Sequence, residues 1–472
     1  MSTLRNTTPT PMRDTVHILG GGLAGLATAY YAQRHGFAPT VFEAAPTLGG
    51  NARTLRFEDA LVDTGAHRLH DKHAGATAAW HALLGDALRR VEAPSEIRYQ
   101  GRGIAFPLRP LDAARQLGPR TLARVAVEVL PRLLRRSGPP ATFRDLALDR
   151  YGPTLAESFL LSYSEKLWGL AANRLDPQVA GGRLRGLTVG TFLREFAGPR
   201  TATAHLDGVF LYPQHGFGML ADALAEAVGP DHLRTNARVT RVGYTSTDEG
   251  RTVQAVVVNH GAPVPVTQVV STLPLPLLLG LLDPAPPAAV REAATRLRYR
   301  HVRLAILRLG IPCFSPHASL YFPEPSLPFT RLYEPKNRSP QMAPPDGTAL
   351  VVEVPCSARD AWWTHDDESF TEALLSHLRR ALGERLDPVL SMHSLRLPHA
   401  YPVLEVGHRV YVERVQAYLR RFTNLTLAGR AGTFRYLHTH DLFAEAEAWA
   451  SGEAARQQGA PARAGASLRT EG

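Results

Sequence analysis

A glycine-rich turn near the N-terminus constrains this chain more than any other feature. The apolar run of residues 15–19 has the character of a short buried strand, and residues 23–35 have the periodicity of a helix. Between them stands the pattern G-x-G-x-x-G, at Gly20, Gly22 and Gly25. In a strand–turn–helix unit these glycines permit a tight bend, the approach of backbone amides to a pyrophosphate, and close packing of helix on sheet. The spacing predicts a dinucleotide-binding unit.

The residues that follow this turn complete the pattern. Residues 39–43 predict a second strand that ends at Glu43, where a carboxylate can accept hydrogen bonds from both hydroxyls of a ribose. Leu23 and Ala24 open the predicted helix, so their amides carry the positive potential of a helix N-terminus toward the phosphates. Gly36 can end that helix with a positive φ. The alternative is a glycine turn that binds no nucleotide. The coincidence of the first strand, the helix, the second strand and its terminal acid disfavours this alternative.

Length and composition bound the architecture. The chain has 472 residues and a mass of 51.5 kDa, which predicts one large two-lobed protein or two closely built domains. Hydrophobic residues make up 44 % and charged residues 20 %, as in globular proteins with a substantial core. A small disulfide scaffold, a wholly disordered chain, a collagen-like chain and a coiled coil are excluded.

The positive charge is carried almost entirely by arginine. The net charge is +10, yet lysine occurs only at Lys72, Lys166 and Lys336. The arginines are scattered rather than clustered, so the sequence does not predict nucleic-acid binding. The planar guanidinium fork suits phosphate and carboxylate groups, which fits an anionic cofactor or substrate.

Cysteine usage and the apolar runs indicate the compartment. Cys313 and Cys356 lie too far apart in the sequence for a zinc site or a C-x-x-C pair, so no metal site is expected. This cysteine usage fits a reducing, cytoplasmic compartment. Residues 16–31 lack the basic start of a signal peptide. Residues 269–282 are interrupted by prolines and are too short to span a membrane.

The pieces of the chain predict an α/β protein with α+β insertions. Two segments interrupt a nucleotide-binding unit: residues 75–205, which are helical and arginine-rich, and residues 284–415, which mix strands with proline-rich loops. The predicted parts are a disordered N-terminus (1–14), a discontinuous nucleotide-binding domain (15–74, 206–283 and 416–456), a substrate-binding domain (75–205 and 284–415) and a disordered tail (457–472).

Residues 122–136 are basic and partly amphipathic. Such a helix can lie on an anionic membrane surface, which leaves peripheral membrane contact open. A packed helix with a solvated arginine face, kinked at Pro131, is the favoured interpretation.

Further motifs resemble a family of flavoproteins along nearly the whole chain. The segment with Gly50 and Arg53, the strands at 237–242 and 268–276, and the segment at 424–432 resemble the FAD-dependent superfamily of amine oxidases, protoporphyrinogen oxidases and phytoene desaturases. The resemblance implies non-covalent FAD in a Rossmann-like domain of the glutathione-reductase type, with an interleaved substrate-binding domain. It places Val239 at the adenine, and Gly429 and Arg430 by the pyrophosphate or ribityl chain.

Two loops resemble the segments that approach the flavin ring in this superfamily. The first is D-T-G-A-H-R-L-H-D-K at 63–72, where the resemblance places Gly65 and His67 at the isoalloxazine. An isolated histidine is as often structural, so His67 keeps both interpretations. The second is F-L-Y-P-Q-H-G-F-G-M-L at 210–220, where Gly216 permits close approach of the backbone.

Other stretches resemble UDP-galactopyranose mutase, a flavoenzyme of the same superfamily. They are G-R-G-I-A-F-P-L at 101–108 and the segment 319–340. The resemblance gives Arg331, and less closely Arg183, the work of gripping a nucleotide-sugar pyrophosphate, and Tyr401 and Tyr436 a place in the phosphate pocket. A salt-bridged arginine and buried tyrosines are the structural alternatives.

These features predict an FAD-dependent oxidoreductase that acts on a small organic molecule. Substrate hydride passes to flavin N5, with His67, Arg331, Tyr401 and Tyr436 as candidate catalytic residues. The alternative is a redox-neutral, mutase-like enzyme acting on a nucleotide sugar, and a flavin-binding protein without turnover is the third possibility. The imidazoles in residues 437–441 depart from the mutase pattern, so its specificity does not carry over.

Overall fold

A five-stranded parallel sheet holds the N-terminal turn. The chain, described by a computed structural model over residues 14–106, 116, 118–133, 138–183 and 209–457, orders this sheet β20-β13-β1-β2-β9. The bounds are β1 Thr15–Leu19, β2 Ala38–Phe42, β9 Leu233–Arg234, β13 Gln268–Ser271 and β20 Leu425–Leu427. Helix α1, Leu23–Arg34, connects β1 to β2. The predicted strand, helix and second strand are confirmed, and Gly36 has a φ of +91° just beyond the helix.

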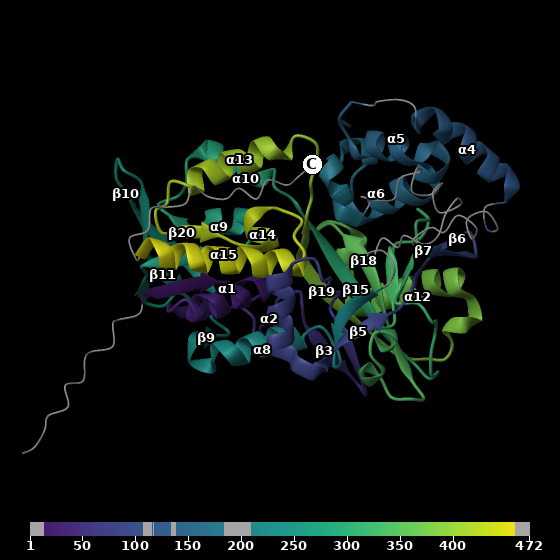
Figure 1. Ribbon diagram of the computed structural model, residues 1–472, viewed down its shortest axis with the longest axis horizontal. Coiled ribbons are helices and arrows are strands. Elements are labelled where there is room, and N and C mark those ends of the chain that lie inside the picture. The colour runs from purple at the N-terminus through teal and green to yellow at the C-terminus, as the bar shows by residue number, and fades with distance from the viewer. Residues whose placement is uncertain (1–13, 107–115, 117, 134–137, 184–208, 458–472) are drawn as a thin grey trace, which may run out of the picture.

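Helices cover this sheet, as its apolar strands require. Helix α1 packs between α8, Met219–Val228, and α15, Thr439–Gln457, and Figure 1 shows α1 and α15 side by side. Val16, Ile18 and Val41 of the strands are fully buried. Residues 429–432 form the start of a short helix, α14, Gly429–Thr433.

A small four-stranded sheet lies beside the first. Its order is β12-β11-β10-β14, with bounds β10 Val239–Ser246, β11 Arg251–Val258, β12 Pro263–Pro265 and β14 Leu282–Asp283. The strand predicted at 237–242 therefore begins later and runs further, because antiparallel pairing with β11 extends it to Ser246. Helices α9 (Leu275–Leu281), α10 (Ala288–Thr295) and α13 (His408–Leu419) belong to the same region.

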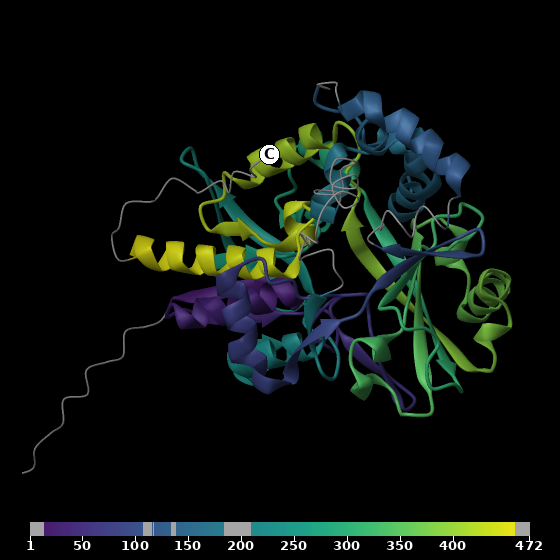
Figure 2. The same ribbon diagram turned by 45° about the vertical axis from the view of Figure 1, so that its right-hand side comes forward.

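The remaining large element is a seven-stranded sheet. Its order is β19-β15-β18-β17-β16-β6-β7, with bounds β6 Ser95–Tyr99, β7 Arg102–Phe106, β15 Tyr299–Leu309, β16 Ser319–Tyr321, β17 Arg331–Tyr333, β18 Thr348–Cys356 and β19 Val389–Pro402. Helices α11 (Ala361–Thr364) and α12 (Asp367–Leu382) accompany it. In Figure 2 this sheet stands opposite the parallel sheet, so the chain has two lobes.

Residues 88–106 correct the expectation of a purely helical segment from 75 to 205. Helix α2, Ala74–Leu84, is followed by β5, Leu88–Glu92, which pairs with β8, Val209–Pro213. Strands β6 and β7 then join the seven-stranded sheet through β16. The pairing of β5 with β8 and of β6 with β16 joins distant parts of the chain, whereas β6 and β7 form a local hairpin across Gln100 and Gly101. Helices α4 (Pro119–Leu133), α5 (Phe143–Leu155) and α6 (Ser162–Trp168) match the prediction.

Helix α4 covers most of the basic amphipathic stretch. Its Val125 is buried, and Glu128 accepts hydrogen bonds from the backbone N–H (2.9 Å) and hydroxyl (2.8 Å) of Thr154 on α5. The packed-helix interpretation fits these contacts, while membrane contact stays a prediction. Among the described helices, none has both the length and the apolar character needed to cross a bilayer. Of the segments predicted to be disordered, 1–14 and 457–472, residues 1–13 and 458–472 lie outside the described residues, whereas Gln457 is the last residue of helix α15.

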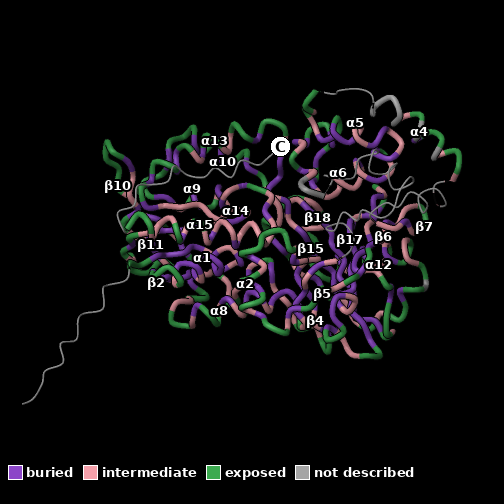
Figure 3. The backbone as a smooth tube through the Cα atoms, in the orientation of Figure 1, coloured by how far each residue is buried: buried purple, intermediate pink, exposed green. Residues whose placement is uncertain are grey.

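The cores of both lobes are dense, and two lysines help to lock them. Figure 3 shows buried segments running through both sheets, with exposed residues on the outer helices. Lys166 of α6 donates hydrogen bonds to four backbone carbonyl oxygens of residues 322–329, at 2.6–3.1 Å. Lys336 binds four carbonyl oxygens of residues 312–347, at 2.6–3.0 Å. Lys72 is exposed. A compact ammonium suits such a ring of oxygens better than a planar guanidinium does.

Candidate active site

The three glycines of the N-terminal turn have the geometry that a dinucleotide needs. Gly20 has a φ of +106°, and a Cβ on Gly25 would overlap the carbonyl oxygen of Gly20. A Cβ on Gly22 would meet only the Cα of Gly50, at 3.9 Å. No side chain caps the N-terminus of α1, where the amides of Leu23 and Ala24 begin the helix. This cradle is lined by backbone and accessible to an anionic group.

Glu43 is held at the end of β2 by backbone donors. Its Oε2 accepts a hydrogen bond from the N–H of Gly21 (2.8 Å), and its Oε1 accepts one from Ala45 (2.8 Å). An ionised carboxylate has about four acceptor positions, so acceptor capacity remains for ribose hydroxyls. The N–H of Ala237 bonds the carbonyl oxygen of Glu43 (2.8 Å), which brings the start of β10 and Val239 alongside. The predicted adenosine residues thus lie together.

Other predicted cofactor residues converge on the same turn. Gly49 donates its N–H to the carbonyl oxygen of Gly21 (2.9 Å), and Gly50 follows with a φ of +58°. Gly429 has a φ of +74°, and a Cβ there would lie 2.7 Å from the Cβ of Ala24. Arg53 donates to the hydroxyl of Thr47 (2.7 Å), while its Nε has no hydrogen-bond partner among the described residues. The residues present fit an adenine dinucleotide.

The two predicted flavin-facing loops pack against each other. The imidazole of His67 stacks on the ring of Phe217, with centroids 4.7 Å apart and an interplanar angle of 26°. Gly216 has a φ of +101°, and the space beside its Cα is filled by the side chain of Thr54. A Cβ on Gly65 would lie only 2.7 Å from Cε1 of the His67 ring, so glycine at this position leaves room for the imidazole.

Asp63 ties these loops together, and sequence reasoning did not identify it. Its carboxylate accepts hydrogen bonds from the Tyr212 hydroxyl, from the Thr54 hydroxyl (2.7 Å) and from the N–H of Phe217 (2.9 Å). Its backbone carbonyl accepts one from the Tyr333 hydroxyl (2.7 Å). Burial raises the pKa of Asp63. An acid at the end of a strand that precedes a glycine turn was the available signal.

The environment keeps His67 neutral. Burial lowers its pKa to about 3, and the nearby charges of Arg430, Arg331 and Arg338 act in the same direction. Its Nδ1 has no hydrogen-bond partner among the described residues. The ring therefore offers a neutral imidazole rather than a cation over the whole physiological range.

Arg331 is paired with a carboxylate that the sequence did not single out. Its Nε and Nη2 donate to Oε2 and Oε1 of Glu353, at 2.9 and 2.6 Å, and both side chains are buried. Glu353 also receives the N–H of Ala66 (3.3 Å), next to His67. The salt-bridged interpretation of Arg331 fits this geometry, because two of its three guanidinium nitrogens form a bidentate pair with a carboxylate.

Aromatic rings build the adjoining wall. The rings of Tyr401 and Tyr436 lie 6.1 Å apart, and Trp168 packs against each with centroids at 5.9 Å. The guanidinium of Arg430 lies 5.0 Å from the centre of the Tyr436 ring and donates to the carbonyl oxygens of Leu437 (2.6 Å) and Ala400 (3.3 Å). Arg430, expected by the pyrophosphate or ribityl chain, thus lies among the tyrosines.

The remaining predicted features are Arg183 and the imidazoles of residues 437–441, of which His438 packs edge-on against Tyr436 with ring centroids 5.4 Å apart. Arg183 ends a short 3-10 turn, and its side chain lies outside the described part of the structure. The imidazoles of His438 and His440, where the sequence departs from the mutase pattern, stack on each other at 5.6 Å. The N–H of His438 bonds the carboxylate of Asp441 (2.7 Å).

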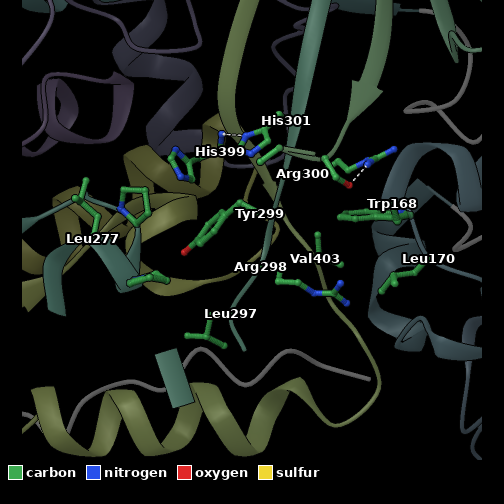
Figure 4. Close-up of a pocket in the computed structure, with 15 residues that line it drawn as sticks. Trp168, Leu170, Leu277, Leu297, Arg298, Tyr299, Arg300, His301, His399 and Val403 are labelled. Atoms are coloured by element: carbon green, nitrogen blue, oxygen red, sulfur yellow. Dashed lines mark hydrogen bonds between the residues drawn. The ribbon is translucent and has the colours of Figure 1, made fainter. Parts of the chain in front are cut away.

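A cavity of about 320 Å³ lies on the other side of Trp168 (Figure 4). Its walls include Trp168, Leu277, Arg298, Tyr299, His301 and His399. Arg298 is paired with Glu405 (2.6 Å), and Nδ1 of His301 accepts the N–H of His399 (3.0 Å). Burial lowers the pKa of both histidines. The cavity therefore has little unpaired charge, unlike the arginine-rich cluster beyond Trp168.

Comparisons with known proteins agree with this arrangement. An L-amino-acid oxidase of Sistrurus catenatus edwardsii is 42 % identical over 66 residues, which are 14 % of this chain and 13 % of that protein. The mitochondrial protoporphyrinogen oxidase of Nicotiana tabacum is 29 % identical over 100 residues, 21 % of this chain and 20 % of that protein. The chain thus matches about a fifth or less of the length of these curated relatives.

Solved structures show the same fold over nearly the whole chain. Reduced UDP-galactopyranose mutase has a TM-score of 0.79 at 20 % identity, covering 93 % of this chain and 95 % of that one. Cyclohexylamine oxidase from Brevibacterium oxydans has a TM-score of 0.65 at 16 % identity, covering 94 % and 100 %. At these identities the likeness concerns the fold. The sequence model described as flavin containing amine oxidoreductase matches residues 23–441. The chain therefore belongs to the family of flavin-containing amine oxidoreductases.

Proposed function

We propose that the enzyme removes a hydride from a C–H bond of a small organic substrate and delivers it to N5 of the flavin. FAD, when bound, supplies the capacity to accept two electrons. The residues of the chain bind and orient the two partners. The backbone of the Gly216 loop and the neutral imidazole of His67 form one side of the site, and the rings of Tyr401, Tyr436 and Trp168 form another.

The observation that carries this proposal is the neutral state of His67 together with the pairing of Arg331. Arg331 gives two of its three guanidinium nitrogens to Glu353, whose carboxylate balances its charge, and Arg430 donates to the backbone carbonyl oxygens of Ala400 and Leu437. Hydride transfer requires neither a charged general base nor a cationic grip on a diphosphate. Neutral His67 and the carboxylate-paired Arg331 match those requirements.

Anaerobic mixing tests the proposal. The oxidised holoenzyme is combined with amines, porphyrinogens or polyenes, and the visible flavin band is followed in a stopped-flow instrument. We expect one substrate class to bleach the band, and re-admission of oxygen or a quinone to restore it. Failure of all three classes to reduce the flavin, with dithionite still reducing it, contradicts the proposal.

A redox-neutral, mutase-like reaction on a nucleotide sugar is the second candidate. The tyrosine pair beside Arg331 and Arg430 favours it, because such a group suits a sugar phosphate. In that case the chemically reduced enzyme binds UDP more tightly than the oxidised enzyme. Arg331→Ala abolishes the difference. Equal UDP binding by both redox forms removes this candidate.

We also infer a division of labour between the lobes. The FAD-binding lobe is of the glutathione-reductase type and comprises residues 15–74, 206–283 and 416–456, and the remaining residues, 75–205 and 284–415, bind substrate. The convergence of Gly22, Glu43 and Gly429 supports this assignment. We expect Gly22→Ala to weaken the binding of FAD. Substitutions of Tyr401 or Tyr436 are expected to alter substrate binding while FAD remains bound.

A further inference from the structure

Buried arginines are a recurrent feature of this chain, and nearly all of them are paired. The described residues include five buried arginines: Arg300, Arg303, Arg308, Arg331 and Arg338. The first four reach a carboxylate, at distances of 3.3 Å (Asp360), 2.6 Å (Asp367), 2.6 Å (Asp59) and 2.6 Å (Glu353). This pairing is the usual condition for burying a charge.

Arg338 departs from that condition. Its side chain is 3 % exposed, and no carboxylate of the described residues lies within ion-pair distance of it. Nη2 donates one long hydrogen bond to the carbonyl oxygen of Ala318 (3.4 Å), and Nε and Nη1 have no hydrogen-bond partner among the described residues. The guanidinium lies 4.7 Å from the centre of the Tyr333 ring and 5.8 Å from that of Tyr212. A ring quadrupole compensates only part of such a charge.

The surroundings connect Arg338 to the predicted flavin-facing loops. Tyr212, beneath the guanidinium, donates its hydroxyl to Asp63, and Asp63 accepts the N–H of Phe217. The ring of Phe217 stacks on His67. The charge of Arg338 reaches His67, since it contributes to the lowered pKa of that imidazole. The carboxylate of Asp63 lies on the other side of Tyr212 from Arg338. It accepts three hydrogen bonds, from Tyr212, Thr54 and Phe217.

We propose that the buried positive charge of Arg338 tunes the bound FAD by favouring its reduced form. A hydride carries one proton and two electrons, so its transfer to neutral oxidised flavin leaves the cofactor with one additional negative charge. A fixed cation in a low-dielectric surrounding stabilises that charge without reorganisation. Asp63, with the opposite sign, limits the effect. The inference rests on FAD as the cofactor and does not depend on which substrate is oxidised.

The reduction potential of the bound flavin tests this role. Arg338→Met removes the charge at similar length, and Arg338→Lys retains it. Anaerobic dye-coupled titration of each holoenzyme yields the midpoint potential. For Arg338→Met we expect the equilibrium constant of two-electron reduction to fall at least tenfold, about 30 mV toward a lower potential. Arg338→Lys is expected to remain close to the unmodified enzyme.

Two further variants separate this role from structural damage. Arg308→Met removes another buried arginine, paired with Asp59 at the turn between β3 (Thr54–Phe57) and β4 (Ala60–Asp63), and should leave the potential unchanged. Asp63→Asn removes the opposing charge and should raise the potential. If Arg338→Met fails to fold, the direction of the Asp63→Asn shift decides.

An unchanged potential in Arg338→Met that retains FAD overturns the proposal, and so does a lower potential in Asp63→Asn. Either result leaves the proposed oxidation standing. The failure of every substrate class to reduce the flavin, with the expected potentials found, would instead contradict the proposed function alone.

Discussion

Gly22 and Gly25 belong to one turn, but the space beside their α carbons differs. A Cβ on Gly25 would overlap the carbonyl oxygen of Gly20, so we expect Gly25→Ala to lower the free energy of unfolding by roughly 1–3 kcal/mol. The methyl group of Gly22→Ala would lie 3.9 Å from the Cα of Gly50, an ordinary contact distance. This substitution should change the free energy of unfolding of the apoprotein by less than about 1 kcal/mol. It places a methyl group in the cradle, so FAD affinity should fall at least tenfold.

Chemical denaturation of both apoproteins and fluorescence titration with FAD measure these effects. Equal loss of stability in the two variants would contradict the assignment of Gly22 to the cofactor cradle.

His67 links the stability of the protein to pH. Its pKa in the folded protein is about 3, whereas the unfolded chain has an ordinary histidine pKa near 6.5. Below pH 6.5 the unfolded state binds a proton at His67 that the folded state does not. The contribution of His67 to the free energy of unfolding is therefore complete above pH 6.5 and is lost as the pH falls toward 3. We therefore expect the free energy of unfolding to decrease less between pH 7.5 and pH 5 in His67→Gln than in the unmodified protein.

Urea denaturation at a series of pH values checks this. The comparison is of the two slopes, because other buried histidines titrate in both proteins. Parallel slopes would show that His67 is protonated normally.

Residues that a short segment requires could be predicted from the sequence, whereas side-chain partners from distant segments could not. Gly20, Gly22 and Gly25 are dictated by a turn of a few residues, and Glu43 by the end of the next strand. The bonds from Asp63 to Tyr212 and Phe217 join segments separated by about 150 residues, and no local pattern announces them. Arg331 was predicted without Glu353 because only the antiparallel register of β17 and β18 sets these two residues opposite each other.

At the scale of elements, Lys166 joins helix α6 to the loop that leads into β17. Four carbonyl oxygens of residues 322–329 converge on its ammonium, and α6 carries Trp168 while β17 begins with Arg331. Lys166→Met leaves those buried oxygens without a donor. We expect it to lower the free energy of unfolding by roughly 2–4 kcal/mol, since an unsatisfied buried group costs about 1–3 kcal/mol.

Denaturation by urea measures the loss, and Lys72→Met is the matched control, since Lys72 is exposed and should change stability by less than about 0.5 kcal/mol. Equal stability of the Lys166 and Lys72 variants would contradict a locking role.

Element prediction succeeded for the strand, helix and strand of residues 15–42, which follow from apolar patterning and one glycine turn. Strand β5 was missed because its partner is the distant β8. Strands β6 and β7 form a local hairpin across Gln100 and Gly101, so a turn signal for them was available in the sequence and was not used. In β19 an irregularity separates Leu397, paired with Val302, from Tyr401, paired with Arg300, and it directs Tyr401 toward the cluster. Pro398 lies within that irregularity, and a proline inside a strand is a sequence signal for an edge or a bulge.

For the whole molecule, FAD should act as a stabilising ligand. A dinucleotide that contacts the N-terminal turn, Glu43 and Gly429 binds only the folded chain. At one hundred times the dissociation constant it should add about 2.7 kcal/mol of stability. FMN lacks the adenylate half that Glu43 is placed to bind, so we expect FAD to raise the Tm of the apoprotein clearly more than FMN does. Circular dichroism melts with each nucleotide test this, and equal shifts would contradict it.

The rarity of lysine gives the native protein an unusual response to amine-directed reagents. Of its ε-amino groups, that of Lys72 is open to solvent, whereas those of Lys166 and Lys336 are enclosed by carbonyl oxygens. Brief acylation should therefore label one lysine side chain in the folded state and all three after denaturation, a difference that intact-mass spectrometry resolves. The chain thus contains its own chemical reporter of local opening, with one reporting group beside Trp168 and another beside the turn that precedes β18.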